Sequence, residues 1–127
     1  MFGVVIVAHG KLAQEYLAAV EHVLGGRQPG IMAIEIHSEI DRAQKQAEIC
    51  AAADSVDNGG VVMVTDLYGS SHCALSLTAC QPQDRCMLSG ANLPMLIKLA
   101  KSRHLPMKEA VNAALEAGKK YINSQMI

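Results

Sequence analysis

The sequence predicts an α/β fold: an open, mainly parallel sheet of about four strands with helices on both faces. Short runs of β-branched and other apolar residues alternate along the chain with segments in which apolar residues recur every three or four positions. The first pattern is typical of strands buried on both faces, and the second of amphipathic helices. Because the two kinds of segment alternate singly, we expect parallel strands that are joined by helices.

Four apolar segments are expected to form the strands. The first and third are apolar throughout, whereas Glu35 interrupts the second. The two most apolar strands are expected at the centre of the sheet, with the others flanking them, which gives the order 2-1-3-4. In chain order the predicted strands are Phe2–Val7, Ile31–Ile36, Val61–Val64 and Arg85–Leu88.

Five helices are expected between and after these strands. Gly25 and Gly26 end the first helix. Asn92 is suited to the N-cap of the fourth helix, and Pro106 closes that segment. The predicted helices are Leu12–Leu24, a segment marked by Ile40 to Ala51, Ser71–Ala79, the segment that starts at Asn92, and Met107–Ile122.

Length and composition limit the classes of protein that the chain can form. Its 127 residues suit one domain, residues 1–127, and a hydrophobic content of 50% is enough for a core. We expect the 11 basic and 12 acidic side chains to be spread evenly, without the basic stripe that nucleic-acid binding needs. The composition therefore predicts no nucleic-acid partner.

The apolar opening and the cysteines bear on localisation. Met1–Ala8 is the longest apolar run; it is too short to span a bilayer and lacks the features of a signal peptide. No two cysteines form a C-x-x-C pair, and a chain of this size does not need disulfides. We expect a cytoplasmic protein that does not insert into the membrane. Its expected reduced core thiols are Cys50, Cys73, Cys80 and Cys86.

The predicted strand order creates a switch point between the first and third strands, where ligand sites of open α/β sheets lie. His9 follows the first strand there, and Asp66 follows the third. A carboxylate bonded to one imidazole nitrogen fixes the tautomer, leaves the other nitrogen as the nucleophile and stabilises the cation formed on substitution. We therefore select His9 and Asp66 as a candidate reactive pair, against the alternatives of a structural histidine and a helix-capping aspartate.

Two turns beside this pair are candidates for binding an anion. No Ser, Thr, Asp or Asn precedes Leu12 to cap the first helix, so the N–H groups around Gly10, Lys11 and Leu12 are candidate donors. The second turn is rich in glycine and serine, which suits a phosphoryl group but also an ordinary helix start. Its candidate residues are Gly69, Ser70, Ser71 and His72.

No metal or organic cofactor is expected. Cys73, Leu77 and Cys80 have helical spacing, which favours a core stripe over a metal site. The glycine motifs of dinucleotide and P-loop nucleotide sites are absent. The remaining histidines, His22, His37 and His104, are expected on the surface.

Three motifs together resemble the mannose-type enzyme IIA of the bacterial phosphoenolpyruvate-dependent sugar phosphotransferase system. They are VVIVAHGKLA (Val4–Ala13), VVMVTDLYGSS (Val61–Ser71) and SGANLPML (Ser89–Leu96), in the family's order and spacing over nearly the whole chain. The closing EAGKKYIN (Glu116–Asn123) is similar to small stand-alone members, which often have regulatory roles.

The resemblance implies a phosphocarrier that needs no cofactor. It implies that His9 accepts the phosphoryl group, that Asp66 supports the imidazole, and that Ser71 supplies a nearby hydroxyl. It also implies a homodimer that takes phosphate from the histidine-containing phosphocarrier protein and passes it to a IIB partner. The family pattern is altered where Ser70 replaces a glycine, His72 a proline and Ala74 an asparagine, which bears on partner choice and onward transfer.

Two other functions remain as alternatives. One is a regulatory binding module that is recognised according to the phosphorylation state of His9, without transfer to sugar. The other is a tetrapyrrole metal chelatase, which can also begin with a strand and an H-G turn. A chelatase needs a second metal ligand, for which His72 is the candidate, and it leaves the TDLYGSS and GANLPML motifs unexplained.

Overall fold

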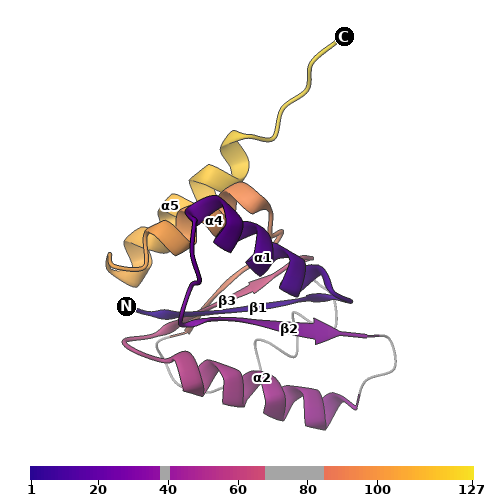
Figure 1. The fold of residues 1–127 in the computed structure, drawn as a ribbon, viewed down its shortest axis with the longest axis vertical. Helices are drawn as coiled ribbons and strands as arrows, with labels where there is room; N and C mark the ends of the chain where they lie inside the picture. The colour runs from indigo at the N-terminus through magenta and orange to yellow at the C-terminus, as the bar shows by residue number, and fades with distance from the viewer. Residues whose placement is uncertain (38–40, 68–84) are drawn as a thin grey trace.

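The computed structural model describes residues 1–37, 41–67 and 85–127, and its centre is a parallel sheet of four strands (Figure 1). The strand order is β2-β1-β3-β4, and every neighbouring pair is parallel. The predicted fold class and strand order are therefore confirmed. The strands are β1 (Gly3–His9), β2 (Ile31–Ile36), β3 (Val61–Thr65) and β4 (Arg85–Leu88).

The central strands are the most apolar ones because both of their faces are covered. All five residues of β3 are buried, as are all residues of β1 except His9. The strand β1 is longer than predicted, because its pairing with β2 continues to the register pair His9 and Ile36. His9 is consequently the last residue of a buried strand rather than the residue that follows it.

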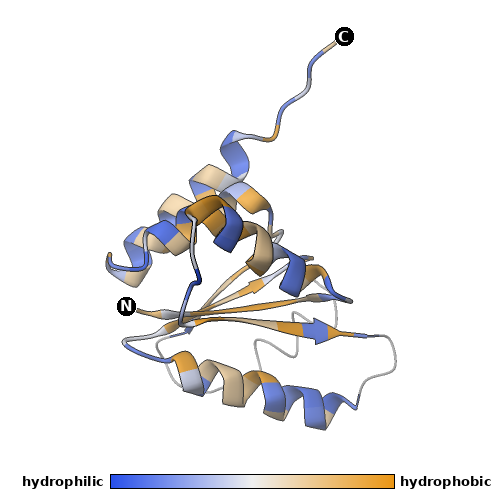
Figure 2. Ribbon diagram, viewed as in Figure 1, coloured by the Kyte–Doolittle hydropathy of each residue, from blue (hydrophilic) through white to orange (hydrophobic). Residues whose placement is uncertain are grey.

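Helices cover both faces of the sheet, as predicted. The helices α1 (Leu12–Leu24), α4 (Leu93–Lys101) and α5 (Met107–Lys120) lie on one face, and α2 (Arg42–Val56) lies on the other (Figure 1). The strands are coloured mostly as hydrophobic in Figure 2. Alternate residues of these apolar strands belong to two separate core layers, one on each face of the sheet. On β1, for example, Val4 and Ile6 face α1 and α4, whereas Val5 and Val7 face α2.

The ends of the helices refine the sequence prediction. Asp41 accepts a hydrogen bond from the backbone N–H of Gln44 at 3.1 Å, so α2 begins at Arg42 and not at Ile40. Asn92 is the N-cap of α4, as predicted, and its side chain accepts from Met95 N at 3.0 Å. The helix predicted over Ser71–Ala79 lies outside the described residues.

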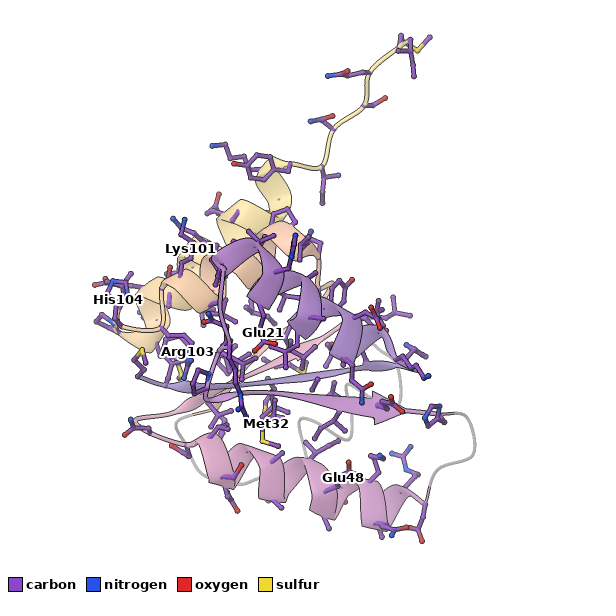
Figure 3. All side chains as sticks on the ribbon, in the orientation of Figure 1. Glu21, Met32, Glu48, Lys101, Arg103 and His104 are labelled. Carbon is purple, nitrogen blue, oxygen red and sulfur yellow. The ribbon has the colours of Figure 1, made fainter. Side chains whose placement is uncertain are left out.

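A buried arginine holds together the edge of the sheet at which the strands begin. Arg103 reaches from the turn between α4 and α5 toward the sheet (Figure 3), and only 6% of its surface is exposed. Its Nε donates to the carbonyl of Phe2 at 2.9 Å, and a terminal nitrogen donates to the carbonyl of Pro29 at 2.6 Å. The guanidinium thus connects β1, the α1–β2 turn and the α4–α5 turn.

Charge and cysteine burial differ from the expectation. Residues 93–127 contain six of the 11 Lys and Arg residues but only two of the 12 Asp and Glu residues, so the charges are not evenly spread.

Cys50 and Cys86 are free thiols but are only partly buried, and Cys73 and Cys80 lie outside the described residues. Within the described ranges, no helix has the length and apolar content to cross a membrane.

Candidate functional site

The turn after β1 presents His9 at the carboxyl edge of the sheet. The N–H of Gly10 donates to the carbonyl of Ile36 at 2.8 Å, which continues the pairing with β2. Gly10 has a φ of +53°, a left-handed conformation that glycine adopts without steric cost. The chain therefore turns sharply after His9 and enters α1 at Leu12.

His9 and Asp66 are in direct contact, as the switch-point argument predicts. Asp66 directly follows β3, the strand beside β1. Its Oδ2 atom accepts two hydrogen bonds from His9: one from the backbone N–H at 3.1 Å and one with ring Nδ1 at 2.6 Å. The His9 side chain is 55% exposed and that of Asp66 is 11% exposed, so a carboxylate at the base of the site holds a ring that faces solvent.

The electrostatics of the pair determine which ring nitrogen can react. Burial raises the pKa of Asp66, but the hydrogen bonds from His9, the electrostatic interaction with His9 and a backbone hydrogen bond together outweigh burial and place that pKa below its ordinary value. Asp66 is therefore ionised at neutral pH and is only an acceptor. The proton in the 2.6 Å contact must then lie on Nδ1, so Nε2 carries the ring's nucleophilic lone pair.

The first turn of α1 lies directly after this pair. Its N-cap residue is Lys11, which makes no capping hydrogen bond through its side chain, as the sequence predicts. Leu12 is 37% exposed, and Lys11 is also exposed. The positive end of the helix dipole and the N–H groups of Lys11 and Leu12 therefore lie close in sequence to His9 and suit a negatively charged group. The N–H of Gly10, which the sequence also offered as a donor, is already bonded to the carbonyl of Ile36.

Tyr16 is a neighbour of the pair that the sequence analysis missed. Its hydroxyl donates to the carbonyl of Ala91 at 3.1 Å. Burial, and in second place the negative charge of Asp66, raise the pKa of Tyr16. Tyr16 lies within the predicted helix Leu12–Leu24, where its sequence position alone assigns it no role in the site. The available signal was its hydroxyl, because a tyrosine on a buried face usually has a polar partner.

The structure does not test every candidate residue of the site. Gly69, Ser70, Ser71 and His72 lie outside the described residues. The remaining histidines are exposed, as predicted, and one of them, His37, pairs with Glu35 at 3.0 Å. Among residues 1–37, 41–67 and 85–127, no three His, Cys, Asp or Glu side chains form a group that could hold a metal ion.

Solved structures share this architecture over almost their full length. Phosphotransferase system component EIIA from Streptococcus agalactiae is 22% identical with a TM-score of 0.85, covering 98% of this chain and 97% of its own. The mannose/sorbose-specific IIA subunit of the phosphotransferase system from Enterococcus faecalis is 20% identical with a TM-score of 0.87, covering 99% and 96%. The IIA protein associated with the fucose utilization operon of Streptococcus pneumoniae is 21% identical with a TM-score of 0.77, covering 91% and 89%. At these identities the likeness shows a common fold.

The family itself is shown by the sequence. Residues 3–117 match the EIIA-man family model, which is described as the fructose IIA component of the phosphotransferase system. No curated protein matches the sequence significantly. The fold and the family define a phosphotransferase component with a role in phosphoryl transfer. The chain belongs to the mannose-type enzyme IIA family, which confirms the resemblance noted in its motifs.

Proposed function

We propose that this chain is a phosphocarrier in which His9 accepts a phosphoryl group from the histidine-containing phosphocarrier protein. It then passes the group to a IIB partner or serves as a regulatory signal. The observation that carries this proposal is the 2.6 Å contact between His9 Nδ1 and Asp66 Oδ2. This contact fixes the tautomer that leaves Nε2 as the nucleophile, on a ring that is more than half exposed.

The transfer step follows from this geometry. His9 Nε2 supplies its lone pair to phosphorus, and the phosphorus–nitrogen bond of the donor breaks, returning its electron pair to the donor imidazole. The His9 ring, now substituted at Nε2 and still protonated at Nδ1, carries a positive charge beside the Asp66 carboxylate. That charge pairing stabilises the phosphorylated state, and the same step in reverse delivers the phosphoryl group to a recipient.

The phosphoryl group itself needs donors for its oxygens. Among the described residues the candidates are the backbone N–H groups of Lys11 and Leu12, at a helix start without a side-chain cap; the Gly10 N–H is bonded to Ile36. The composition of the second turn adds Gly69, Ser70, Ser71 and His72 as candidates, and the family resemblance singles out the Ser71 hydroxyl among them. Neither group of donors involves a metal or an organic cofactor.

We also propose that the protein is a cytoplasmic homodimer and that residues 1–127 form a single IIA domain. The family resemblance is the main support for the dimer. A second support is the segment after α5, which extends away from the body of the molecule (Figure 1). It exposes the apolar side chains of Tyr121, Ile122 and Met126, which association would cover.

The test is phosphoryl transfer to the purified chain. Wild type, His9→Ala and His37→Ala are incubated with phosphoenolpyruvate, enzyme I and the phosphocarrier protein, and their intact masses are followed. His37 is a matched control, because it is also an exposed histidine whose ring contacts a carboxylate, that of Glu35. It directly follows β2, the strand beside β1. We expect one acid-labile phosphoryl group on wild type and His37→Ala and none on His9→Ala. Equal labelling of His9→Ala, or no labelling of wild type, contradicts the proposal.

Onward transfer is tested separately by adding IIB proteins to the phosphorylated chain. Loss of the phosphoryl group to a IIB protein supports the transport form of the proposal. If the group stays on His9 with every IIB protein, the regulatory form is supported. Pull-downs that compare the phosphorylated wild type with His9→Ala then identify the partner that reads the modification.

A further inference from the structure

Tyr16 has a hydroxyl that core packing does not explain. It lies on α1, seven residues after His9, among the side chains that pack against the core on the α1 face of the sheet. Its hydroxyl donates to the carbonyl of Ala91, in the segment between β4 and α4, across a separation of 75 residues. Phenylalanine or leucine would fill the same apolar space, so the hydroxyl requires a separate reason.

Ala91 connects Tyr16 to the reactive pair. Its N–H donates to the carbonyl of Thr65 at 3.0 Å. That carbonyl belongs to the planar peptide unit that joins Thr65 to Asp66, so the hydrogen bond restrains the orientation of this unit. Two hydrogen bonds in series therefore run from α1 to the residue that holds His9.

The contacts form a closed circuit around the site. Asp66 Oδ2 accepts both N–H groups of His9, the chain passes from His9 through the Gly10 turn into α1, and Tyr16 on α1 bonds back to Ala91. The Tyr16 hydroxyl is protonated at neutral pH, as in any ordinary tyrosine, and can donate; burial first and then the charge of Asp66 shift its pKa further upward.

We propose that Tyr16 is a positioning residue for the phosphoryl acceptor: through Ala91, its hydroxyl holds the Thr65–Asp66 peptide so that Asp66 can bond both N–H groups of His9. Small displacements of an orienting carboxylate matter because transfer needs the attacking nitrogen in line with the breaking bond. The effect of Tyr16 on the rate of phosphoryl transfer rests on the proposed function. The effect of Tyr16 on the His9–Asp66 contact before phosphorylation is independent of that function.

The test compares Tyr16→Phe with Tyr121→Phe. Tyr121→Phe is the control, because it also removes a tyrosine hydroxyl, but from a side chain that is 61% exposed and lies just after the end of α5. Two quantities are measured: the rate of phosphoryl gain on His9, and the NMR shifts of His9 Nδ1 and the Asp66 carboxyl carbon before phosphorylation. We expect Tyr16→Phe to slow phosphoryl gain about fivefold, as for loss of one neutral hydrogen bond, and to move both shifts. Tyr121→Phe is expected to change neither.

A double variant separates positioning from a general loss of structure. If Tyr16 acts through Asp66, Tyr16→Phe has no further effect on the rate once Asp66→Asn is present. All variants are compared at a temperature at which each is folded by circular dichroism. The inference is overturned if Tyr16→Phe leaves the rate and both shifts unchanged, or slows the Asp66→Asn protein by the same factor as wild type.

The two proposals fail in different ways. If wild type gains no phosphoryl group, the proposed function fails, and the NMR shifts of the unphosphorylated variants still decide the positioning role. If wild type is phosphorylated and Tyr16→Phe matches it in rate and shifts, the proposed function stands and the positioning role is wrong.

Discussion

Replacing Asp66 by Asn tests how much the carboxylate contributes to phosphoryl transfer. The substitution preserves size and leaves an oxygen that can accept from His9 in place of Oδ2. It removes the negative charge that stabilises the ring after substitution at Nε2. It also places an amide N–H₂ where Oδ1 lies, and Oδ1 is buried without a hydrogen-bond partner among the described residues.

The expected magnitude follows from the two hydrogen bonds that converge on Oδ2. A hydrogen bond to a charged group contributes about 1.5–3 kcal/mol, against about 1 kcal/mol for a neutral one. The energy lost when the charged acceptor becomes a neutral one is largest for the bond from the His9 ring, at 2.6 Å. Solvent screening reduces that loss, because the His9 side chain is 55% exposed. A loss of about 1.4 kcal/mol in the transition state slows phosphorylation about tenfold.

The assay is an intact-mass time course of phosphoryl gain and of its spontaneous loss, with Asp41→Asn as the control. Asp41 is also a carboxylate that accepts a backbone hydrogen bond, but it caps α2, where asparagine serves equally well. We expect Asp66→Asn to gain the phosphoryl group about tenfold more slowly and to lose it faster, and Asp41→Asn to match wild type. If the rate and the phosphohistidine lifetime of Asp66→Asn both equal those of wild type, the role assigned to Asp66 is wrong.

Two further predictions concern the stability of the fold. Because the pKa of Asp66 is lower in the folded protein than in the unfolded chain, its stabilising contribution is present above about pH 4 and is lost as the pH falls through the folded value. Urea unfolding should therefore show a difference between wild type and Asp66→Asn that shrinks below about pH 4, and a constant difference contradicts the linkage. Arg103→Met should lower the free energy of unfolding, measured by urea titration, by about 3 kcal/mol. The substitution removes the charged donors to the carbonyls of Phe2 and Pro29. A loss below about 1 kcal/mol would show that these two hydrogen bonds contribute little to stability.

The sequence predicts the sheet well because burial dictates its composition. A strand covered on both faces must be apolar at every position, and β1 and β3 are. Their central places then follow, and with them the switch point that brings His9 and Asp66 together. The contact between these two residues was therefore predictable from strand order and from the residues at the strand ends.

The features that were missed depend on contacts across the chain. Tyr16 and Arg103 each bond to backbone carbonyls far away in sequence, at Ala91 and at Phe2, and no local pattern marks a carbonyl that needs a partner. The start of α2 was misplaced because hydrophobic spacing includes Ile40, whereas the cap formed by Asp41 determines where the helix begins. The even spread of charge was wrong because α4 and α5 gather five of the seven lysines.

The most direct test of the account is to identify which ring nitrogen of His9 carries the phosphoryl group. The chain is labelled with ¹⁵N-histidine and phosphorylated, and the nitrogen bonded to phosphorus is assigned by ¹⁵N and ³¹P NMR. Since Asp66 Oδ2 holds Nδ1 at 2.6 Å, the account predicts phosphorylation at Nε2 of His9. A phosphoryl group on Nδ1 of His9, or on any other residue, would contradict it.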